Sequence, residues 1–329
     1  MHSVISDDMR VSYPQIVRHV IKNGKKRSAR GIPTLDAGPT TITLRNPINA
    51  VPLDVGRKLN LKIGAAETVQ LIAGVSSLAQ LNNVSGNRFA RFATDDVLCG
   101  AYGPRIYTQM RHVLQNLHND PDTRQSVVSI WTQSELNNIN ADVPCTVALG
   151  FSLMDGVLNM NVIMRSNDVW LGVPYDFMMF TQLQHAAAWA LNVNVGTYTH
   201  TTWSLHMYAS DIEKADELHM STYDSPNVPT FAPLIDHGYA DGPRLTAEQI
   251  DTRWHNITHT ALTYVTSLLN IDGETTKSAH WYNHVLESSR NAHRLCVMCR
   301  YIHDDSRFIT EDDLRTGHYD ICVTCLRKL

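Results

Sequence analysis

Hydrophobic residues repeat with helical spacing in four stretches of the chain. The pattern predicts core-packed helices over residues 67–81, 107–117, 177–191 and 247–269. In the third stretch Phe177, Phe180 and Leu183 share one face, and Gly196 is expected to mark its end. A further short helix is expected over residues 14–23.

Other stretches favour strands and connections. Residues 126–131 are β-prone, and residues 146–164 read as two strands joined at Asp155-Gly156, a typical tight hairpin turn. The basic stretch 22–30 reads as a loop, and residues 221–243, with four prolines, read as a surface connection. Irregular alternation of helices and strands with an antiparallel hairpin predicts a layered α+β fold.

Composition limits the domain organisation and the partners. The chain has 329 residues, of which 43% are hydrophobic and 18% charged, so we expect a main domain over residues 1–290 and an appendage over 291–329. A net charge of -4 provides no general field for nucleic acid, which favours a small-molecule partner. No signal peptide or membrane span is predicted, so the expected location is the cytoplasm.

The appendage contains two C-x-x-C pairs. This spacing predicts a tetrahedral zinc site with four thiolate ligands, Cys296, Cys299, Cys322 and Cys325. The metal is expected to be structural, because so short a segment cannot build an adequate core by itself. A nucleic-acid or protein-docking role of this module stays open, since its arginines are offset by acidic residues.

Several polar motifs precede the appendage in a definite order. Glu67 is followed at the seventh position by Gly74, Tyr102-Gly103 comes next, and a turn carrying Arg124 leads into a β-prone run. The later blocks are Val143-Pro144-Cys145, the run 164–176 that reads MRSNDVWLGVPYD, and the run 204–208 that reads SLHMY. Each is weak alone, and a lone cysteine is more often a buried structural residue. Their joint order and spacing over residues 28–220 resemble the thymidylate synthase family, which includes the deoxycytidylate hydroxymethylases.

The resemblance implies covalent catalysis on a pyrimidine nucleotide. Cys145 would add as a thiolate to carbon 6 of the base, so that carbon 5 can attack the one-carbon unit of methylenetetrahydrofolate. Glu67 would handle protons, and Tyr102 would lie close to the nucleophile. Asp168 matches the aspartate that contacts the pterin of the folate co-substrate.

The resemblance also implies how the nucleotide is held. The phosphate ligands would be Arg30, Arg124, Arg165 and Ser166, and the ligands of the ribose 3'-hydroxyl would be His206 and Tyr208. Arg124 is expected to come from the other subunit of a homodimer. The family usually has a second arginine at the position of Gln125, so the phosphate grip is expected to be weaker or rearranged. The family also usually has a histidine at the position of Thr146, and the effect of this departure is left open.

Asp176 stands where uracil-reading members of the family carry Asn. An ionised Asp cannot donate to the O4 oxygen of uracil, whereas a carboxyl group can share a proton with N3 of cytosine and accept from its amino group. The alternative interpretation is that Asp176 caps the helix that follows.

The expected product is 5-hydroxymethylated rather than methylated. The chain lacks the tryptophan pair that synthases carry after the stretch matching Asn82-Asn83-Val84, so water should reach the exocyclic methylene. The closing tail of the synthases is replaced by the cysteine module.

We therefore expect a folate-dependent dCMP 5-hydroxymethyltransferase that supplies a precursor of modified DNA, with a bacteriophage origin suggested by the resemblance alone. The alternatives are a CMP hydroxymethylase, a pyrimidine nucleotide methylating enzyme, a uridylate enzyme, or a nucleotide- or DNA-binding protein working through the zinc module.

Overall fold

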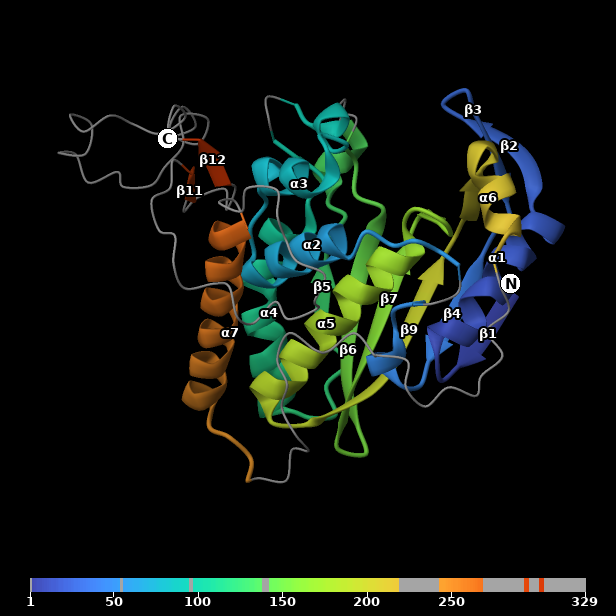
Figure 1. Cartoon of the computed structure of the whole chain (residues 1–329). Helices are drawn as coiled ribbons and strands as arrows, with labels where there is room; N and C mark the ends of the chain where they lie inside the picture. Colours follow the sequence, from blue (N-terminus) through green and yellow to red (C-terminus); the bar gives the residue numbers. More distant parts are fainter. Residues whose placement is uncertain are drawn as a thin grey trace.

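A six-stranded mixed sheet forms the centre of the fold (Figure 1). The structure is a computed structural model that describes residues 2–53, 56–94, 97–137, 142–218 and 243–268, and the short strands β11 (His293–Leu295) and β12 (Ile302–Asp304). The central strands, in spatial order, are β1 (His2–Ser6), β4 (Thr40–Leu44), β9 (Asn194–Thr202), β7 (Val157–Met164), β6 (Thr146–Met154) and β5 (Val127–Ser129). Neighbours run antiparallel except β1 with β4 and β7 with β9.

Helices cover one face of this sheet. The helices that pack against one another there are α2 (Leu61–Ala73), α4 (Tyr102–Asn119), α5 (Val173–Leu191) and α7 (Ala247–Leu268). On β7, Met160, Val162 and Met164 are buried, whereas Asn161 and Ile163 on the opposite face are exposed. The remaining helices are α1 (Met9–Asn23), α3 (Leu78–Ser85) and α6 (Ile212–Asp216). The predicted α+β class is confirmed.

The single helix predicted over residues 67–81 is wrong, because the chain forms α2 and α3 there. Gly74 ends α2 in the left-handed region at φ 71°, and its N–H bonds the carbonyls of Gln70 and Leu71. A Cβ at Gly74 would clash with the ring of Tyr107. The Ser77 hydroxyl then caps α3 by accepting from the Gln80 N–H. Hydrophobic spacing continued across this break and concealed it.

The predicted hairpin of residues 146–164 is confirmed. Strands β6 and β7 pair in register from Leu149 with Val162 to Met154 with Val157. Asp155 and Gly156 form the turn with φ of 53° and 77°, the two positive values that a type I' turn requires.

The basic stretch 22–30 is not simply a loop. Residues 25–29 form β2 (Lys25–Ala29), which pairs with β3 (Ile32–Asp36) in a second sheet of order β2-β3-β10-β8, completed by β10 (Leu205–Tyr208) and β8 (Asn167–Asp168). Every residue of β2 is exposed, so this edge strand carries no alternation of buried and polar positions that could have predicted it. Arg30 and Gly31 form the turn between β2 and β3, both with positive φ.

Helix α5 starts earlier than predicted. Its N-cap is Gly172, Pro174 lies in its first turn, and Asp176 is already inside the helix. The interpretation of Asp176 as a helix cap is therefore wrong. The helix ends at Leu191, and Asn192 caps it in the left-handed region. Gly196 lies within β9, so the expectation that Gly196 marks the end of the helix is wrong.

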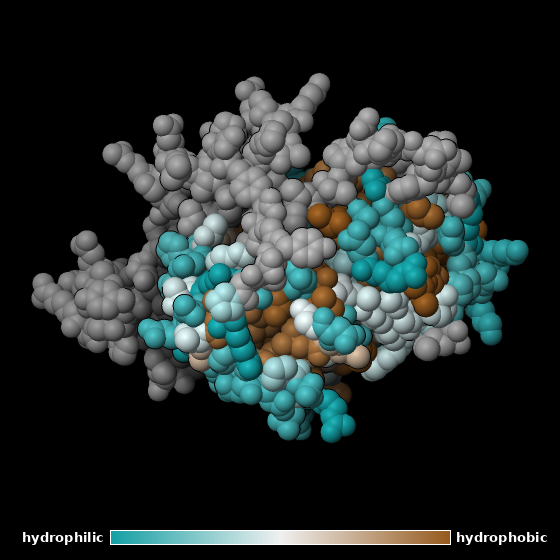
Figure 2. Space-filling view, turned by 90° about the horizontal axis from the view of Figure 1, so that it is seen from below, coloured by the Kyte–Doolittle hydropathy of each residue, from teal (hydrophilic) through white to brown (hydrophobic). Residues whose placement is uncertain are grey.

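The core fills the space between the sheet and the helices. Its largest fully buried side chains include Tyr13, Phe177, Phe180 and Tyr198. Seen from below, hydrophobic residues show through the middle of the molecule and hydrophilic residues border them (Figure 2). Among the described residues, no helix is long and apolar enough to cross a membrane. The expected boundary near residue 290 and the four cysteines of the predicted zinc module fall outside the residues that the structure describes, so both stay predictions.

Candidate active site

Cys145 lies in the segment that enters β6, and the end of β7 fixes it there. The Arg165 N–H donates to the Cys145 carbonyl at 2.9 Å. The Arg165 guanidinium donates from Nε to the Pro144 carbonyl at 2.8 Å and from Nη2 to the Val143 carbonyl at 3.0 Å. It also lies 5.4 Å from the centre of the Trp131 ring. The predicted neighbours Cys145 and Arg165 are thus brought together, and Arg165 also orders the backbone on which Cys145 stands.

The Cys145 thiol is held mainly in its protonated form. Burial raises its pKa above the ordinary value, the positive charge of Arg165 opposes that rise, and the charges of Asp176 and Asp142 add to it. Arg30 also lowers the pKa, through space from the β2–β3 turn. The expectation that arginines favour ionisation is correct in direction, but burial outweighs them in the free chain.

Two buried carboxyl groups, Glu67 and Asp176, interact electrostatically, and Asp176 also acts on the Cys145 thiol. Glu67 projects from α2, and burial, reinforced by the charge of Asp176, raises the pKa of Glu67 to about 8. Asp176 projects from the first turns of α5, and burial raises its pKa to about 7. At neutral pH both groups can therefore hold or release a proton, which general acid and base catalysis requires.

Tyr102 begins α4 and faces the same place. Its hydroxyl accepts a 3.3 Å hydrogen bond from the backbone N–H of Thr146, directly after the nucleophile. Burial and the charges of Cys145 and Asp176 raise the pKa of Tyr102 well above its usual range. Tyr102 therefore stays a neutral hydroxyl, and the N–H of Thr146 helps to position it.

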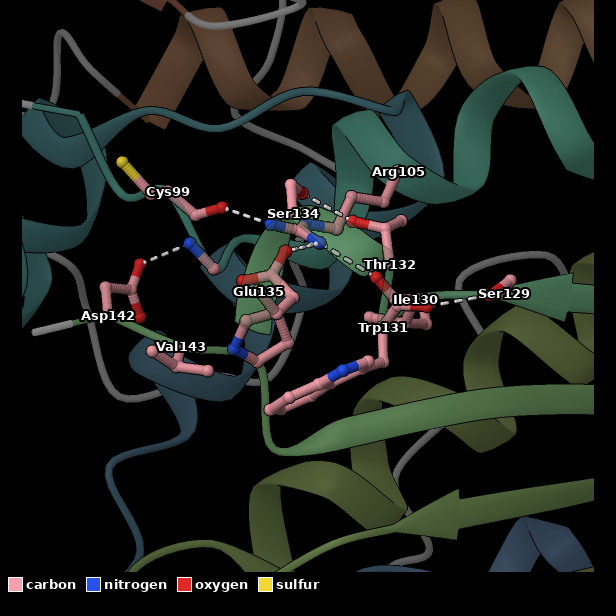
Figure 3. Close-up of polar contacts among 12 residues, drawn as sticks. Cys99, Arg105, Ser129, Ile130, Trp131, Thr132, Ser134, Glu135, Asp142 and Val143 are labelled. Carbon is pink, nitrogen blue, oxygen red and sulfur yellow. Dashed lines mark hydrogen bonds and ion pairs between the residues drawn. The ribbon is translucent and has the colours of Figure 1, made fainter. Parts of the chain in front are cut away.

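An ion pair that the sequence did not suggest supports the loop before Cys145 (Figure 3). Arg105 of α4 bonds the Glu135 carboxylate at 2.6 Å and the carbonyls of Ile130 and Cys99 at 2.8 and 2.7 Å. Nearby, the Asp142 carboxylate accepts from the Gly100 N–H at 2.7 Å. Arg105 lies three residues after Tyr102 on α4, a spacing that places both side chains on one face of the helix. This spacing was the signal in the sequence that could have placed Arg105 near the site.

Three of the predicted sugar and phosphate ligands, Ser166, His206 and Tyr208, form a second group at the β8–β10 edge. The Ser166 hydroxyl lies 3.3 Å from Nδ1 of His206, and the rings of His206 and Tyr208 meet edge to face. Arg30 is exposed at its hairpin turn. Arg124 is exposed on the turn before β5, and no hydrogen bond or ion pair described for the chain joins it to Cys145.

Asp168 fits its expected contact with a pterin. Its Oδ1 accepts from the N–H groups of Trp170 and Leu171, both at 2.7 Å, which fixes the carboxyl group. Its Oδ2 is buried with no hydrogen-bond partner and lies 3.9 Å from Nε2 of His206. A buried acceptor in this state needs a donor, which the amino and ring N–H groups of a pterin would provide.

A buried polar chain adjoins Asp176 and was also missed. Nδ2 of Asn167 lies 2.8 Å from Nε2 of His200, and Nδ1 of His200 lies 2.9 Å from the hydroxyl of Tyr198. Asn167 also opposes the rise in the pKa of Asp176 that burial causes. His200 and Tyr198 lie on β9 at positions that read as ordinary strand alternation, so sequence spacing alone gave no signal for them.

No group of three or more metal-ligating side chains occurs in the part of the chain that the structure describes. The predicted zinc ligands are not among those residues.

Comparison with known sequences agrees with this geometry. Residues 11–232, about two thirds of the chain, match the thymidylate synthase family profile. The chain belongs to the thymidylate synthase family.

Individual relatives of this family member differ in their named activities. One is a deoxyuridylate hydroxymethyltransferase of Bacillus phage SP01, 32% identical over 251 residues, which are 68% of this chain and 65% of the phage protein. Another is a thymidylate synthase of Staphylococcus haemolyticus, 30% identical over 138 residues, covering 41% of this chain and 43% of the relative. A thymidylate synthase of Buchnera aphidicola is 27% identical over 216 residues, covering 62% and 81%. The chain thus spans just under two thirds of the length of the phage relative.

Proposed function

We propose that this thymidylate synthase family member is a folate-dependent deoxycytidylate 5-hydroxymethyltransferase. The observation that carries the proposal is the carboxyl group of Asp176, placed inside the site beside Glu67 and Cys145 rather than used as a helix cap. A carboxyl group at this place suits a base that offers both an amino donor and a ring-nitrogen acceptor.

The residues divide the chemistry among them. Cys145 forms the bond to carbon 6 of the base as its thiol proton leaves, and carbon 5 becomes nucleophilic. Methylenetetrahydrofolate supplies the one-carbon unit when bound. Glu67, with its pKa raised to about 8, handles protons near the base, including the proton lost from carbon 5. Tetrahydrofolate departs as that proton is lost, and water then adds to the exocyclic carbon to give the hydroxymethyl group. Expulsion of Cys145 restores the aromatic base.

Asp176 can read cytosine through one shared proton. Its raised pKa, about 7, means that the carboxyl group carries a proton in much of the population near neutral pH. One oxygen then shares that proton with N3, and the other accepts from the amino group.

A uridylate hydroxymethyltransferase is the second candidate, because the phage relative of 32% identity bears that name. A protonated Asp176 could donate to O4 of uracil and accept from its N3–H. The two candidates differ in which carboxyl oxygen carries the proton.

Product analysis separates these candidates. Purified protein is incubated with methylenetetrahydrofolate and, separately, dCMP, CMP or dUMP, and the products are analysed by mass. Hydroxymethyl-dCMP as the main product supports the proposal, a CMP product indicates a ribonucleotide enzyme, a hydroxymethyl-dUMP product favours the second candidate, and a methyl product indicates a synthase.

Two variants test the assigned roles. Cys145→Ser should abolish product formation with every nucleotide, and retained turnover would contradict covalent catalysis. Asp176→Asn should shift preference from dCMP towards dUMP. The matched control is Asp155→Asn in the exposed β6–β7 turn, where Asn-Gly serves as well as Asp-Gly and preference should not change.

We also propose that the site is completed in a homodimer. Val127 and Ile163 are exposed hydrophobic residues on the central sheet, with 54% and 39% of their surfaces accessible, and a second copy could cover them. Arg124, exposed on the turn before β5, would then reach the phosphate in the partner subunit.

A further inference from the structure

Arg57 lies in the short segment that leads into α2, and its side chain folds onto Trp170. The guanidinium carbon lies 4.4 Å from the centre of the Trp170 ring, a cation–π distance. Nη2 of Arg57 donates to the Trp170 carbonyl at 3.2 Å, and Nη1 donates to the Lys58 carbonyl at 2.9 Å. Trp170 is 6% exposed and belongs to the core. One half-buried arginine thus holds both the ring and the carbonyl of a core tryptophan.

The backbone N–H of the same tryptophan fixes the carboxyl group of Asp168. Oδ1 of Asp168 accepts from the N–H groups of Trp170 and Leu171, both at 2.7 Å. The Gly172 N–H closes this turn by donating to the Asp168 carbonyl at 3.0 Å. Oδ2 of Asp168 is buried with no hydrogen-bond partner among the described residues. Because two backbone donors hold Oδ1, the direction in which Oδ2 points depends on where the backbone of Trp170 lies.

A second contact anchors the segment that carries Arg57. The Tyr175 hydroxyl, in the first turn of α5, accepts from the backbone N–H of Asn60 at 3.0 Å. Asn60 is also the N-cap of α2, so the helix fixes its place. The guanidinium of Arg57 is therefore presented to Trp170 by a backbone that is tied to both α2 and α5.

We infer that Arg57 is a positioning residue for the folate co-substrate, which holds Trp170 so that Oδ2 of Asp168 faces the pterin. Loss of Arg57 loosens the turn over residues 168–172 and weakens folate binding. The predicted phosphate and sugar ligands make no described contact with Arg57, so nucleotide binding is unaffected. The inference rests on the proposed function, because it takes Asp168 as the residue that contacts the pterin.

A direct bond from Arg57 to the co-substrate is the competing explanation. Nε of Arg57 is buried and has no hydrogen-bond partner within the described part of the chain, and a guanidinium can bind the carboxylates of a folate. The two explanations differ in one respect. If Arg57 acts through Asp168, its replacement has little effect once Asp168 can no longer accept from the pterin, whereas a direct bond is lost in either background.

The test measures the Kd of tetrahydrofolate for the full-length protein by titration calorimetry. The Kd values of dCMP and dUMP and the KM of methylenetetrahydrofolate are measured in parallel. Arg57→Gln should raise the tetrahydrofolate Kd about tenfold and change the nucleotide Kd values by less than about twofold, because only the hold on Trp170 is lost. Arg57→Lys keeps a charge over the ring but loses the planar fork, so its Kd should lie between those of wild type and Arg57→Gln.

A second variant separates the two explanations. Asp168→Asn keeps one acceptor for the backbone N–H groups and replaces the acceptor Oδ2 by a donor, so it should weaken tetrahydrofolate binding at least as much as Arg57→Gln. The double variant Arg57→Gln with Asp168→Asn should bind tetrahydrofolate no more weakly than Asp168→Asn alone.

The matched control is Arg253→Gln, which breaks the same kind of contact elsewhere. The Arg253 guanidinium lies 4.8 Å from the centre of the Trp189 ring, and its Nη1 donates to the Trp189 carbonyl at 2.9 Å. Trp189 is near the end of α5, whereas Asp168 precedes the start of that helix. Arg253→Gln should lose stability in urea unfolding and keep the wild-type Kd for tetrahydrofolate.

An unchanged tetrahydrofolate Kd in Arg57→Gln would overturn the inference, as would an equal rise in the nucleotide Kd values or the same rise in Arg253→Gln. Additive losses in the double variant would also overturn it, because they indicate a direct bond. A wild type that binds tetrahydrofolate but makes no hydroxymethyl-dCMP would reject the proposed function, while these Kd values still decide the role of Arg57. A wild type that does not bind tetrahydrofolate would overturn both.

Discussion

Replacing Glu67 by Gln should stabilise the protein at alkaline pH while removing its proton-handling group. Burial raises the pKa of Glu67 from 4.5 to about 8. The folded state then holds this proton more tightly than the unfolded state, so the contribution of Glu67 is fully present below pH 4.5 and is lost as pH rises to about 8. A glutamine has no proton to lose, so the variant escapes this penalty.

The size of the effect follows from the interval between the two pKa values. At about 1.4 kcal/mol per pH unit, the interval from 4.5 to about 8 corresponds to about 5 kcal/mol. Glu67 retains some contact with solvent, which reduces the penalty. We therefore expect Glu67→Gln to gain about 2–5 kcal/mol over wild type at pH 8.5 and much less at pH 5.

The assay is urea unfolding of both proteins at pH 5 and pH 8.5, with turnover measured in parallel. Glu217→Gln, an exposed carboxylate just after α6, is the matched control and should show no such pH-dependent difference. A gain for Glu67→Gln that is equal at both pH values would refute the conclusion that burial keeps Glu67 protonated.

Three further perturbations test other parts of the structure. Arg105→Gln should cost about 3–5 kcal/mol in unfolding free energy and reduce turnover, because it removes the arginine that pairs with the buried Glu135 carboxylate. Arg111→Gln, which breaks an exposed pair, should cost much less in the same urea titration. Mixing the inactive Cys145→Ser and Arg124→Ala variants should restore up to about a quarter of wild-type activity if subunits exchange at random and Arg124 serves the partner's site. About half of the dimers are then mixed, and one of the two sites in each mixed dimer is intact. If mass analysis of tagged subunits shows exchange but activity does not recover, Arg124 does not serve the partner's site. Elemental analysis should find about one zinc per chain, and a truncation after residue 290 should contain none; a metal-free wild type would reject the zinc module.

The sequence predicted a nucleotide site from short motifs around Glu67, Tyr102, Cys145 and Asp176, and the roles of these residues stay predictions. In the structure Asp176 acts electrostatically on each of the other three. Hydrophobic spacing predicted the long helices α4, α5 and α7 and the β6–β7 hairpin, because each has a regular period and a recognisable turn or end.

Long-range contacts were beyond the reach of such patterns. Strand β2 is wholly exposed and polar, so only its pairing with β3 defines it, and the division of α2 from α3 follows from the close approach of Gly74 to Tyr107. The clamp of Arg105 on Glu135 joins residues thirty positions apart.

What the sequence by itself determined was the set of reactive groups and the local elements that carry them, since both follow from side-chain chemistry and short-range periodicity. What only the tertiary structure decided was the protonation of those groups. Burial raises the pKa of Glu67 and Asp176 towards neutrality and holds the Cys145 thiol protonated, and burial is produced by packing α2, α4 and α5 against the sheet. Asp176 likewise interacts with the buried Tyr198, which only the folded sheet brings near it.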